Sequence, residues 1–126
     1  TPAELNLHRR MVQRLSAFKL RPVEYSILLL VDANAGINQK QIGEALSVSP
    51  PNLVAVINRL LKRRVLRRSQ SRQDRRVQHL HLTTAGAELL AQADAEVHRF
   101  ETDIVGSLSA TELRALKQAL VKMIRL

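Results

Sequence analysis

Between residues 38 and 63 the sequence divides into two helical segments separated by a serine-rich turn. These helix start and stop signals constrain the fold more than any other feature of the chain. Asn38 followed three residues later by Gln41 is typical of a capping box, which starts a short helix. The Ser-Val-Ser turn at 47–49 ends that helix. The two prolines at 50–51 fit the first turn of the next helix, because amide donors there have no partner within the helix. The segment therefore predicts a helix-turn-helix.

The chain changes from helical to strand spacing after residue 64. Residues 65–69 and 77–82 are predicted to form two short strands, and the polar residues 70–76 form the loop between them. A hairpin directly after a helix-turn-helix is a wing. The sequence therefore predicts a mainly α fold with a small β-hairpin wing, a winged helix-turn-helix whose central lobe spans about residues 22–83.

Helices are also predicted on both sides of this lobe. Residues 2–18 and 84–126 have apolar side chains at helical spacing, and a Ser109–Glu112 capping box opens the last helix. The apolar stripe of that helix consists of Leu113, Leu116, Leu120, Met123 and Ile124. Because the lobe has its own core, the stripes of the terminal helices need a partner surface. We expect a single domain, 1–126, whose N- and C-terminal helices form a homodimer.

The net charge of +9 is concentrated in one short segment. Residues 59–76 hold nine lysines and arginines against one acid, Asp74, and so carry +8, whereas the remaining 11 cations face 10 acids. A cationic run is usually only a solvated surface, but this one coincides with the predicted second helix and wing. That coincidence favours contact with a polyanion, and we predict that the lobe binds double-stranded DNA.

The composition excludes several other kinds of chemistry. The chain has no cysteine, which rules out disulfides, thiolate metal ligands and thiol oxidation as a trigger. Its longest apolar run, 27–31, is far short of the roughly 20 residues that span a bilayer, so we expect no membrane segment. The first residues lack the pattern of a signal peptide. We expect no cofactor, because no phosphate-binding loop or nucleophile motif is found.

The second helix of a helix-turn-helix enters the major groove, and residues near its N-terminus reach base edges. Asn52 has an amide suited to a two-bond contact with adenine, while Ala55 and the prolines suit thymine methyl groups, which predicts some A·T preference. The same amide is equally suited to supporting the helix cap. The candidate base-reading residues are Ser49, Pro50, Pro51, Asn52, Ala55, Asn58 and Arg59.

Most of the cationic segment is predicted to contact phosphates. The wing loop, with small polar residues and three arginines, also suits the narrow minor groove and its negative potential. Asp74 in that loop would be repelled by DNA, so we expect it to pair with a neighbouring arginine and hold the loop in one conformation. The candidate phosphate and wing residues are Gln39, Lys40, Lys62, Arg63, Arg64, Arg67, Arg68, Arg72, Asp74, Arg75 and Arg76.

Two groups of residues carry a family resemblance. They are Asp74-Arg75-Arg76 followed by Leu80, Leu82-Thr83 and Gly86, and Val48-Ser49 leading into Asn58-Arg59-Leu60. With these residues the chain resembles, over essentially its whole length, the MarR family of bacterial winged-helix transcriptional regulators. The resemblance implies a cytoplasmic DNA-binding protein, not an enzyme, that acts as a ligand-responsive repressor. In a two-fold dimer the two reading helices lie about one DNA turn apart, roughly 34 to 36 Å, so the operator is expected to be an inverted repeat.

The resemblance also implies roles for single residues. Arg75 is the candidate for the minor groove, and Asp74 is its positioning partner. One departure is Arg64, which stands just after the second helix where similar members commonly have glycine. Glycine suits the left-handed geometry of a helix end, so we expect strain in this turn, and Arg64 is a candidate for an additional phosphate contact.

Regulation by a small molecule is expected from the resemblance alone. Family members often bind phenolic or anionic compounds between the dimer helices and the DNA-binding lobe. His8, Arg9 and Tyr25 are the candidate effector residues here. Core packing for Tyr25 and a solvated helix surface for His8 are the alternatives.

Two other functions were weighed against DNA-dependent regulation. An enzyme or metal site would have to use the four histidines, and His79 with His81 share one strand face, but two ligands do not complete a site and we expect no bound metal. An RNA-binding module usually exposes stacking aromatics, whereas Phe18, Tyr25 and Phe100 fall on apparent core stripes. Nonspecific DNA binding stays open.

Overall fold

The computed structural model describes residues 2–106 and 109–125, without the side chains of 2–5, 116, 120 and 123–125. Its elements are α1 (Pro2–Ser16), α2 (Pro22–Ala33), α3 (Gln39–Leu46), α4 (Pro50–Lys62), β1 (Leu66–Gln70), β2 (Gln78–Leu82), α5 (Thr84–Val105) and α6 (Ala110–Arg125). The predicted order of helices and hairpin is confirmed. Of the apolar stripe predicted on the last helix, the side chains of Leu116, Leu120, Met123 and Ile124 lie outside the described residues.

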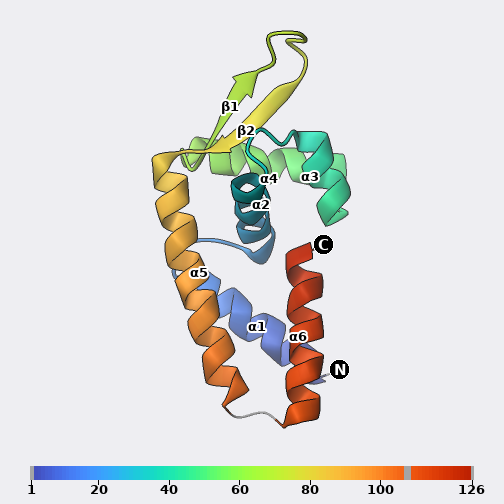
Figure 1. The fold of residues 1–126 in the computed structure, drawn as a ribbon, viewed down its shortest axis with the longest axis vertical. Coiled ribbons are helices and arrows are strands. Elements are labelled where there is room, and N and C mark those ends of the chain that lie inside the picture. Colours follow the sequence, from blue (N-terminus) through green and yellow to red (C-terminus); the bar gives the residue numbers. More distant parts are fainter. Residues whose placement is uncertain (1, 107–108, 126) are drawn as a thin grey trace.

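The molecule is elongated, with the hairpin at one end and the first and last helices at the other (Figure 1). α5 runs down one side from the base of the hairpin and packs against α1 and α2, while α6 returns on the opposite side toward α2 (Figure 1). α4 lies across the lobe and contacts α2, α3 and β1. Buried side chains from α1 to α5 and both strands form one core cluster, with Ile27, Ile57 and Phe100 among its most enclosed members.

The start of α3 follows from local side-chain chemistry. The Asn38 side chain accepts a hydrogen bond from the Gln41 amide at 2.9 Å, and the Asn38 amide donates to the Gln41 side chain at 3.0 Å, so the predicted capping box is confirmed. Ser47 ends the helix in the left-handed conformation, with φ +53°. Ser49 occupies the N-cap position of α4, but its hydroxyl makes no capping hydrogen bond. Pro51 at the second position of α4 lacks an amide hydrogen, so only the Asn52 amide is left for such a cap to accept from.

The end of α4 has the geometry of a Schellman motif. The Arg64 amide donates to the Leu61 carbonyl at 2.9 Å, and the Val65 amide donates to the Leu60 carbonyl at 3.2 Å. Arg64 has φ +61°, which confirms that a left-handed position is occupied here by arginine. Buried Val65 lies close in the motif to buried Leu60, so the strained turn is held from both sides.

The two strands form an antiparallel ribbon whose register opposes Leu66 to Leu82. His79 extends this ribbon, because it pairs with Asn38 as an isolated bridge and its Nδ1 lies 2.7 Å from the Gly36 carbonyl oxygen. The wing is therefore attached to the loop before α3 as well as to α4.

Gly86 permits a close crossing of the start of α5 over the end of α4. A Cβ atom at this position would lie 2.0 Å from the Val65 carbonyl oxygen, so no larger residue fits without movement. Thr83 caps α5 by accepting from the Gly86 amide at 3.0 Å, and its hydroxyl donates to the Arg64 carbonyl at 2.6 Å. This crossing ties α5 to the turn that leads into the wing.

The N-terminal helix ends at Ser16, two residues earlier than predicted, in a second left-handed turn. Lys19 has φ +54°, its amide donates to the Ser16 carbonyl at 2.9 Å, and the Leu20 amide donates to the Leu15 carbonyl at 3.2 Å. This is the same pattern of bonds as at the end of α4.

The base of the molecule is held by charge as well as by packing. Arg14 on α1 donates to Glu96 at 2.7 Å and to Asp103 at 2.9 Å, both on α5. Its guanidinium carbon also lies 5.6 Å from the centre of the Phe100 ring. α1 and α5 thus form a connected scaffold.

Candidate nucleic-acid interface

One face of α4 is packed and the opposite face is open. Leu53, Val56, Ile57 and Leu60 are buried on the inner face. The exposed residues are Pro50, Pro51, Asn52, Val54, Ala55, Asn58, Arg59 and Lys62, which include every predicted base-reading position on this helix. Val54, with 41% of its surface exposed, was missed in the sequence analysis, although the helical spacing that placed Ala55 outside also places Val54 there.

Asn52 is exposed at the start of the open face. Its amide has no hydrogen-bond partner among the described residues, and no side-chain bond to the helix cap is formed. The amide is therefore available to a ligand and does not support the helix cap, and base reading by Asn52 stays a prediction.

Asn58 and Arg68 connect the reading helix to the wing. Arg68 on β1 donates from Nη2 to the Asn58 Oδ1 at 3.2 Å. Both side chains are exposed, and the bond uses the amide oxygen of Asn58, which leaves its NH₂ group free to donate. Both residues were predicted to contact DNA, whereas the bond between them was not predicted.

Arg63 is not a free cation. Its Nη1 donates to the Lys19 carbonyl at 2.8 Å and its Nη2 donates to the Phe18 carbonyl at 3.1 Å. Both terminal nitrogens of its guanidinium are thus bonded within the chain, and its contact with a phosphate stays a prediction. Sequence offers no signal for this bond, since the partners are backbone atoms 44 and 45 positions away.

The wing loop is ordered by its one acid. Asp74 accepts from the Arg76 amide at 3.0 Å and from the Arg76 Nε at 3.1 Å and Nη2 at 3.3 Å. Hydrogen bonds to the Arg76 side chain, followed by that to its amide, lower the pKa of Asp74. The Ser71 hydroxyl accepts from the Gln73 and Asp74 amides. Pairing of Asp74 with an arginine is confirmed, but the partner is Arg76 and not Arg75.

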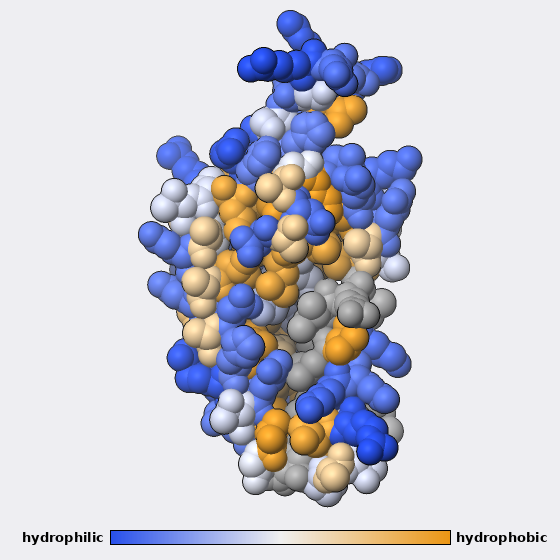
Figure 2. All heavy atoms as spheres, viewed as in Figure 1, coloured by the Kyte–Doolittle hydropathy of each residue, from blue (hydrophilic) through white to orange (hydrophobic). Residues whose placement is uncertain are grey.

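The remaining wing cations face outward. Arg67, Arg72 and Arg75 are exposed, and none has a side-chain hydrogen bond or ion pair within the described part of the chain. In Figure 2 the hairpin loop is an almost wholly hydrophilic projection, while apolar side chains gather on the body below it. The unpaired cations described above, from residues 59–76, therefore lie on the outer surface of the lobe.

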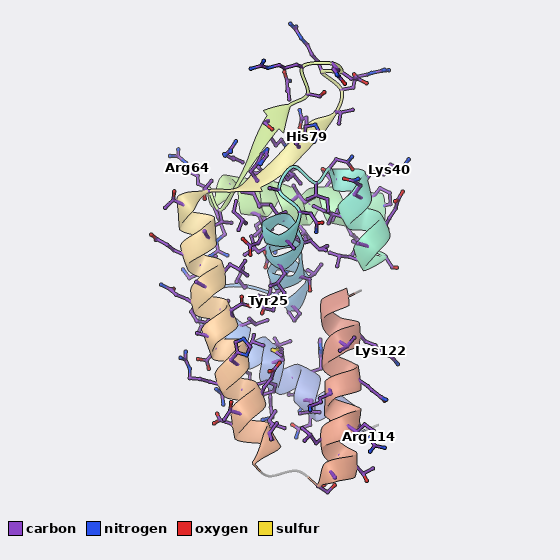
Figure 3. The ribbon with its side chains drawn as sticks, viewed as in Figure 1. Tyr25, Lys40, Arg64, His79, Arg114 and Lys122 are labelled. Atoms are coloured by element: carbon purple, nitrogen blue, oxygen red, sulfur yellow. The ribbon has the colours of Figure 1, made fainter. Side chains whose placement is uncertain are left out.

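Lys40 and Arg64 lie at opposite sides of the same lobe, and both side chains point away from the body (Figure 3). Lys40 is exposed and Gln39 half-buried in the first turn of α3. With Pro50 they line an open hollow of about 490 Å³ between α3 and α4. The positive surface therefore extends on both sides of the reading helix.

The candidate effector residues do not form a described site. Tyr25 is buried with 5% of its surface exposed, and its hydroxyl donates to Asp94 on α5. Burial, together with this bond, raises the pKa of the Tyr25 hydroxyl. His8 and Arg9 are exposed on α1, and no described hydrogen bond joins them to Tyr25. Core packing, the stated alternative to an effector contact, therefore explains the position of the Tyr25 side chain.

The histidine pair on the wing is used for structure. His81 Nε2 lies 2.8 Å from the Ser69 hydroxyl across the ribbon, and His79 contacts Gly36 as described above. Burial and the nearby Arg67 charge lower the pKa of His81. Among the described residues no group of three or more histidines and acids is placed to hold a metal ion. In the same part of the chain, no helix is long and apolar enough to cross a membrane.

The fold and the basic reading surface define a winged-helix DNA-binding protein, and comparison with known proteins gives the same class. The family model described as MarR family matches residues 20–77. The solved structure of the transcriptional repressor CouR bound to a 23-mer DNA duplex is similar at 34% identity, covering 98% of this chain and 88% of that one, with a TM-score of 0.85. The chain belongs to the MarR family and is a DNA-binding transcriptional regulator rather than an enzyme.

Two further relatives extend the comparison. A protein of Thauera aromatica, described as a putative transcriptional regulatory protein for the hcr operon, is 29% identical over 97% of this chain and 80% of its own length. The PcaV transcriptional regulator from Streptomyces coelicolor, solved in complex with its natural ligand, is 21% identical with a TM-score of 0.76, covering 94% of this chain and 86% of that one. At that identity PcaV shows the shared fold alone.

Proposed function

We propose that the protein is a homodimeric, ligand-responsive repressor that binds an inverted-repeat operator through α4 and the wing. The observation that carries the proposal is the open face of α4, joined by the Asn58–Arg68 bond to a hairpin with free arginines. A continuous surface with candidate base-reading side chains in its middle and cations around it suits the major and minor grooves of duplex DNA. We propose that the protein acts in the bacterial cytoplasm, where duplex DNA is found.

The contacts divide into two kinds. Asn52, Ala55 and Asn58 on the open face of α4 are proposed to read base edges in the major groove, with Pro50, Pro51, Val54 and Arg59 beside them. Arg75 is proposed to enter the minor groove, held at the wing tip by the Asp74–Arg76 pair next to it. The surrounding phosphate ligands are Gln39, Lys40, Lys62, Arg64, Arg67 and Arg72.

The dimer is proposed to form through α1, α5 and α6, the helices within 2–18 and 84–126. Val105 at the end of α5 and Val121 on α6 expose 42% and 48% of their surfaces. Arg114 and Lys122 on α6 point away from α1 and α5 in Figure 3, so that side of α6 is the solvated one. CouR is itself bound to a DNA duplex, which supports the same use of this fold.

An effector is proposed to be a small phenolic or anionic compound. Exposed His8 and Arg9 offer positive or polar contacts to such a compound, and PcaV is a regulator of this fold with a bound natural ligand. Tyr25 joins only by exchanging its bond to Asp94 for one to the ligand. Induction requires that the effector bind the DNA-incompetent arrangement more tightly than the competent one.

The decisive experiment is selection of bound duplexes from a random pool. We expect enrichment of an inverted repeat with half-site centres about 10 base pairs apart, bound by twice the chain mass of 14.2 kDa. Titration of the selected and of random duplex with salt should then give affinities that differ by about 10³-fold or more. Recovery of no common sequence, with equal affinity for both duplexes, would contradict sequence-specific repression.

A further inference from the structure

Arg63 connects two helix ends that are far apart in the chain. It is the C-cap residue of α4, and its guanidinium donates to the carbonyls of Phe18 and Lys19, which follow α1. The hydrogen bonds of the left-handed turn at Lys19 use the Leu15 and Ser16 carbonyls, and Arg63 is the partner that the described residues offer to the carbonyls of Phe18 and Lys19. A cation is also favoured at the negative end of a helix.

Both ends of this connection are anchored. On one side, α1 is fixed to α5 by Arg14 with Glu96 and Asp103, and by the buried side chain of Leu15. On the other side, the turn after α4 is held to the start of α5 through Thr83 and the Arg64 carbonyl. The Arg63 guanidinium therefore connects the scaffold of α1 and α5 to the last turn of α4, the reading helix.

We propose that Arg63 is a positioning residue that sets the direction of α4 relative to α1 and α5. The inference rests on the proposed function, because in a dimer held by the terminal helices that direction also sets the spacing of the two reading helices. It removes Arg63 from the phosphate ligands and assigns it to sequence discrimination.

The geometry explains why a bond at one end of α4 affects base contacts at the other. α4 has 13 residues and is therefore about 20 Å long. With its C-terminal end as the pivot, a tilt of about 5° moves its first turn by roughly 2 Å. Hydrogen bonds to bases weaken steeply with changes of a few tenths of an ångström, whereas nonspecific attraction to phosphates depends little on such a shift.

Arg63→Lys is the most discriminating test, because it keeps the positive charge and loses the pair of hydrogen bonds to the two carbonyls. A lysine ammonium is a single point donor group and does not reproduce the fork that spans two carbonyls. We expect the affinity for the selected duplex to fall about tenfold, while the affinity for random duplex and the salt slope stay within error of the wild-type values. Arg63→Gln should show the same loss of discrimination, with little change in slope.

Lys62→Ala is the matched control. Lys62 precedes Arg63, is exposed and has no described partner, so it is assigned to phosphate. Its loss should weaken binding to both duplexes together and make the logarithmic salt slope of the dimer shallower by about 1.8, which is about 0.9 for each protomer.

Other outcomes would overturn the proposal. If Arg63→Lys behaves as the wild type while Arg63→Gln makes the salt slope shallower, Arg63 is a phosphate ligand. If both variants weaken both duplexes equally, or unfold without cooperativity, Arg63 serves stability only. A wild-type protein that does not discriminate between the duplexes refutes the proposed function itself, before any variant is compared.

Discussion

Gly86→Ala is expected to destabilise the protein severely, although alanine favours helices. The new Cβ would lie 2.0 Å from the Val65 carbonyl oxygen, 2.9 Å from its carbonyl carbon and 3.2 Å from its Cα. All three are backbone atoms of a left-handed turn that is already held by two hydrogen bonds, so no side chain can rotate away. The first turn of α5 must then move by about 1 Å to reach ordinary contact distance.

That movement strains or breaks two bonds, from the Thr83 amide to the Val65 carbonyl at 3.2 Å and from the Thr83 hydroxyl to the Arg64 carbonyl at 2.6 Å. Each contributes about 1 kcal/mol. Overpacking of a close contact adds roughly 1–3 kcal/mol. The helix propensity of alanine offsets about 1 kcal/mol. We therefore expect the free energy of unfolding to fall by about 2–4 kcal/mol.

Equilibrium unfolding in urea, followed by circular dichroism, measures this change from the midpoint and slope. Gly106→Ala is the matched control, because among the described residues its Cβ would meet only the Thr102 carbonyl oxygen at 3.9 Å, and we expect it to be neutral or up to about 1 kcal/mol stabilising. If Gly86→Ala unfolds within 0.5 kcal/mol (about the size of an ordinary surface effect) of the wild type, the argument from the crossing is wrong.

Three further predictions concern charge and strain. Arg64→Gly should raise the free energy of unfolding by about 0.5–1 kcal/mol, since it relieves φ +61°, yet weaken DNA binding and make the salt slope of the dimer shallower by about 1.8, which is about 0.9 for each protomer; an increase in both stability and DNA affinity would remove Arg64 from the interface. Arg75→Ala should weaken binding, measured by fluorescence anisotropy, without changing the thermal midpoint, and unchanged affinity would exclude the wing tip from the complex. Bonds to Arg14 and Arg99 lower the pKa of Glu96, so its contribution is present above its ordinary pKa of 4.5 and is lost as the pH falls through the lowered value. As the pH falls through that range, the free energy of unfolding of Glu96→Gln should decrease less than that of the wild type. An unchanged pH profile would contradict the role of the Glu96 bonds to Arg14 and Arg99.

The parts of the fold that depend on near neighbours were predictable from the sequence. The capping boxes at Asn38–Gln41 and Ser109–Glu112 join residues three positions apart, and the side chains concerned have few other partners within reach. The open and packed faces of α4 follow from helical periodicity in the same way. Arg64 was recognised as an anomaly because a helix end has a local geometry that disfavours most side chains.

The uses of individual charges were decided by tertiary structure. Residues 59–76 show their excess of cations in the sequence, but the sequence treats nine of them alike. Folding brings Arg63 to carbonyls 44 and 45 positions away and Arg68 to Asn58 on another element, whereas Arg67, Arg72 and Arg75 have no such partner in the part of the chain that the structure describes. Periodicity and caps are set by bonds within one or two turns, whereas the partner of a long flexible side chain depends on which distant backbone the packed core brings within about 3 Å of it.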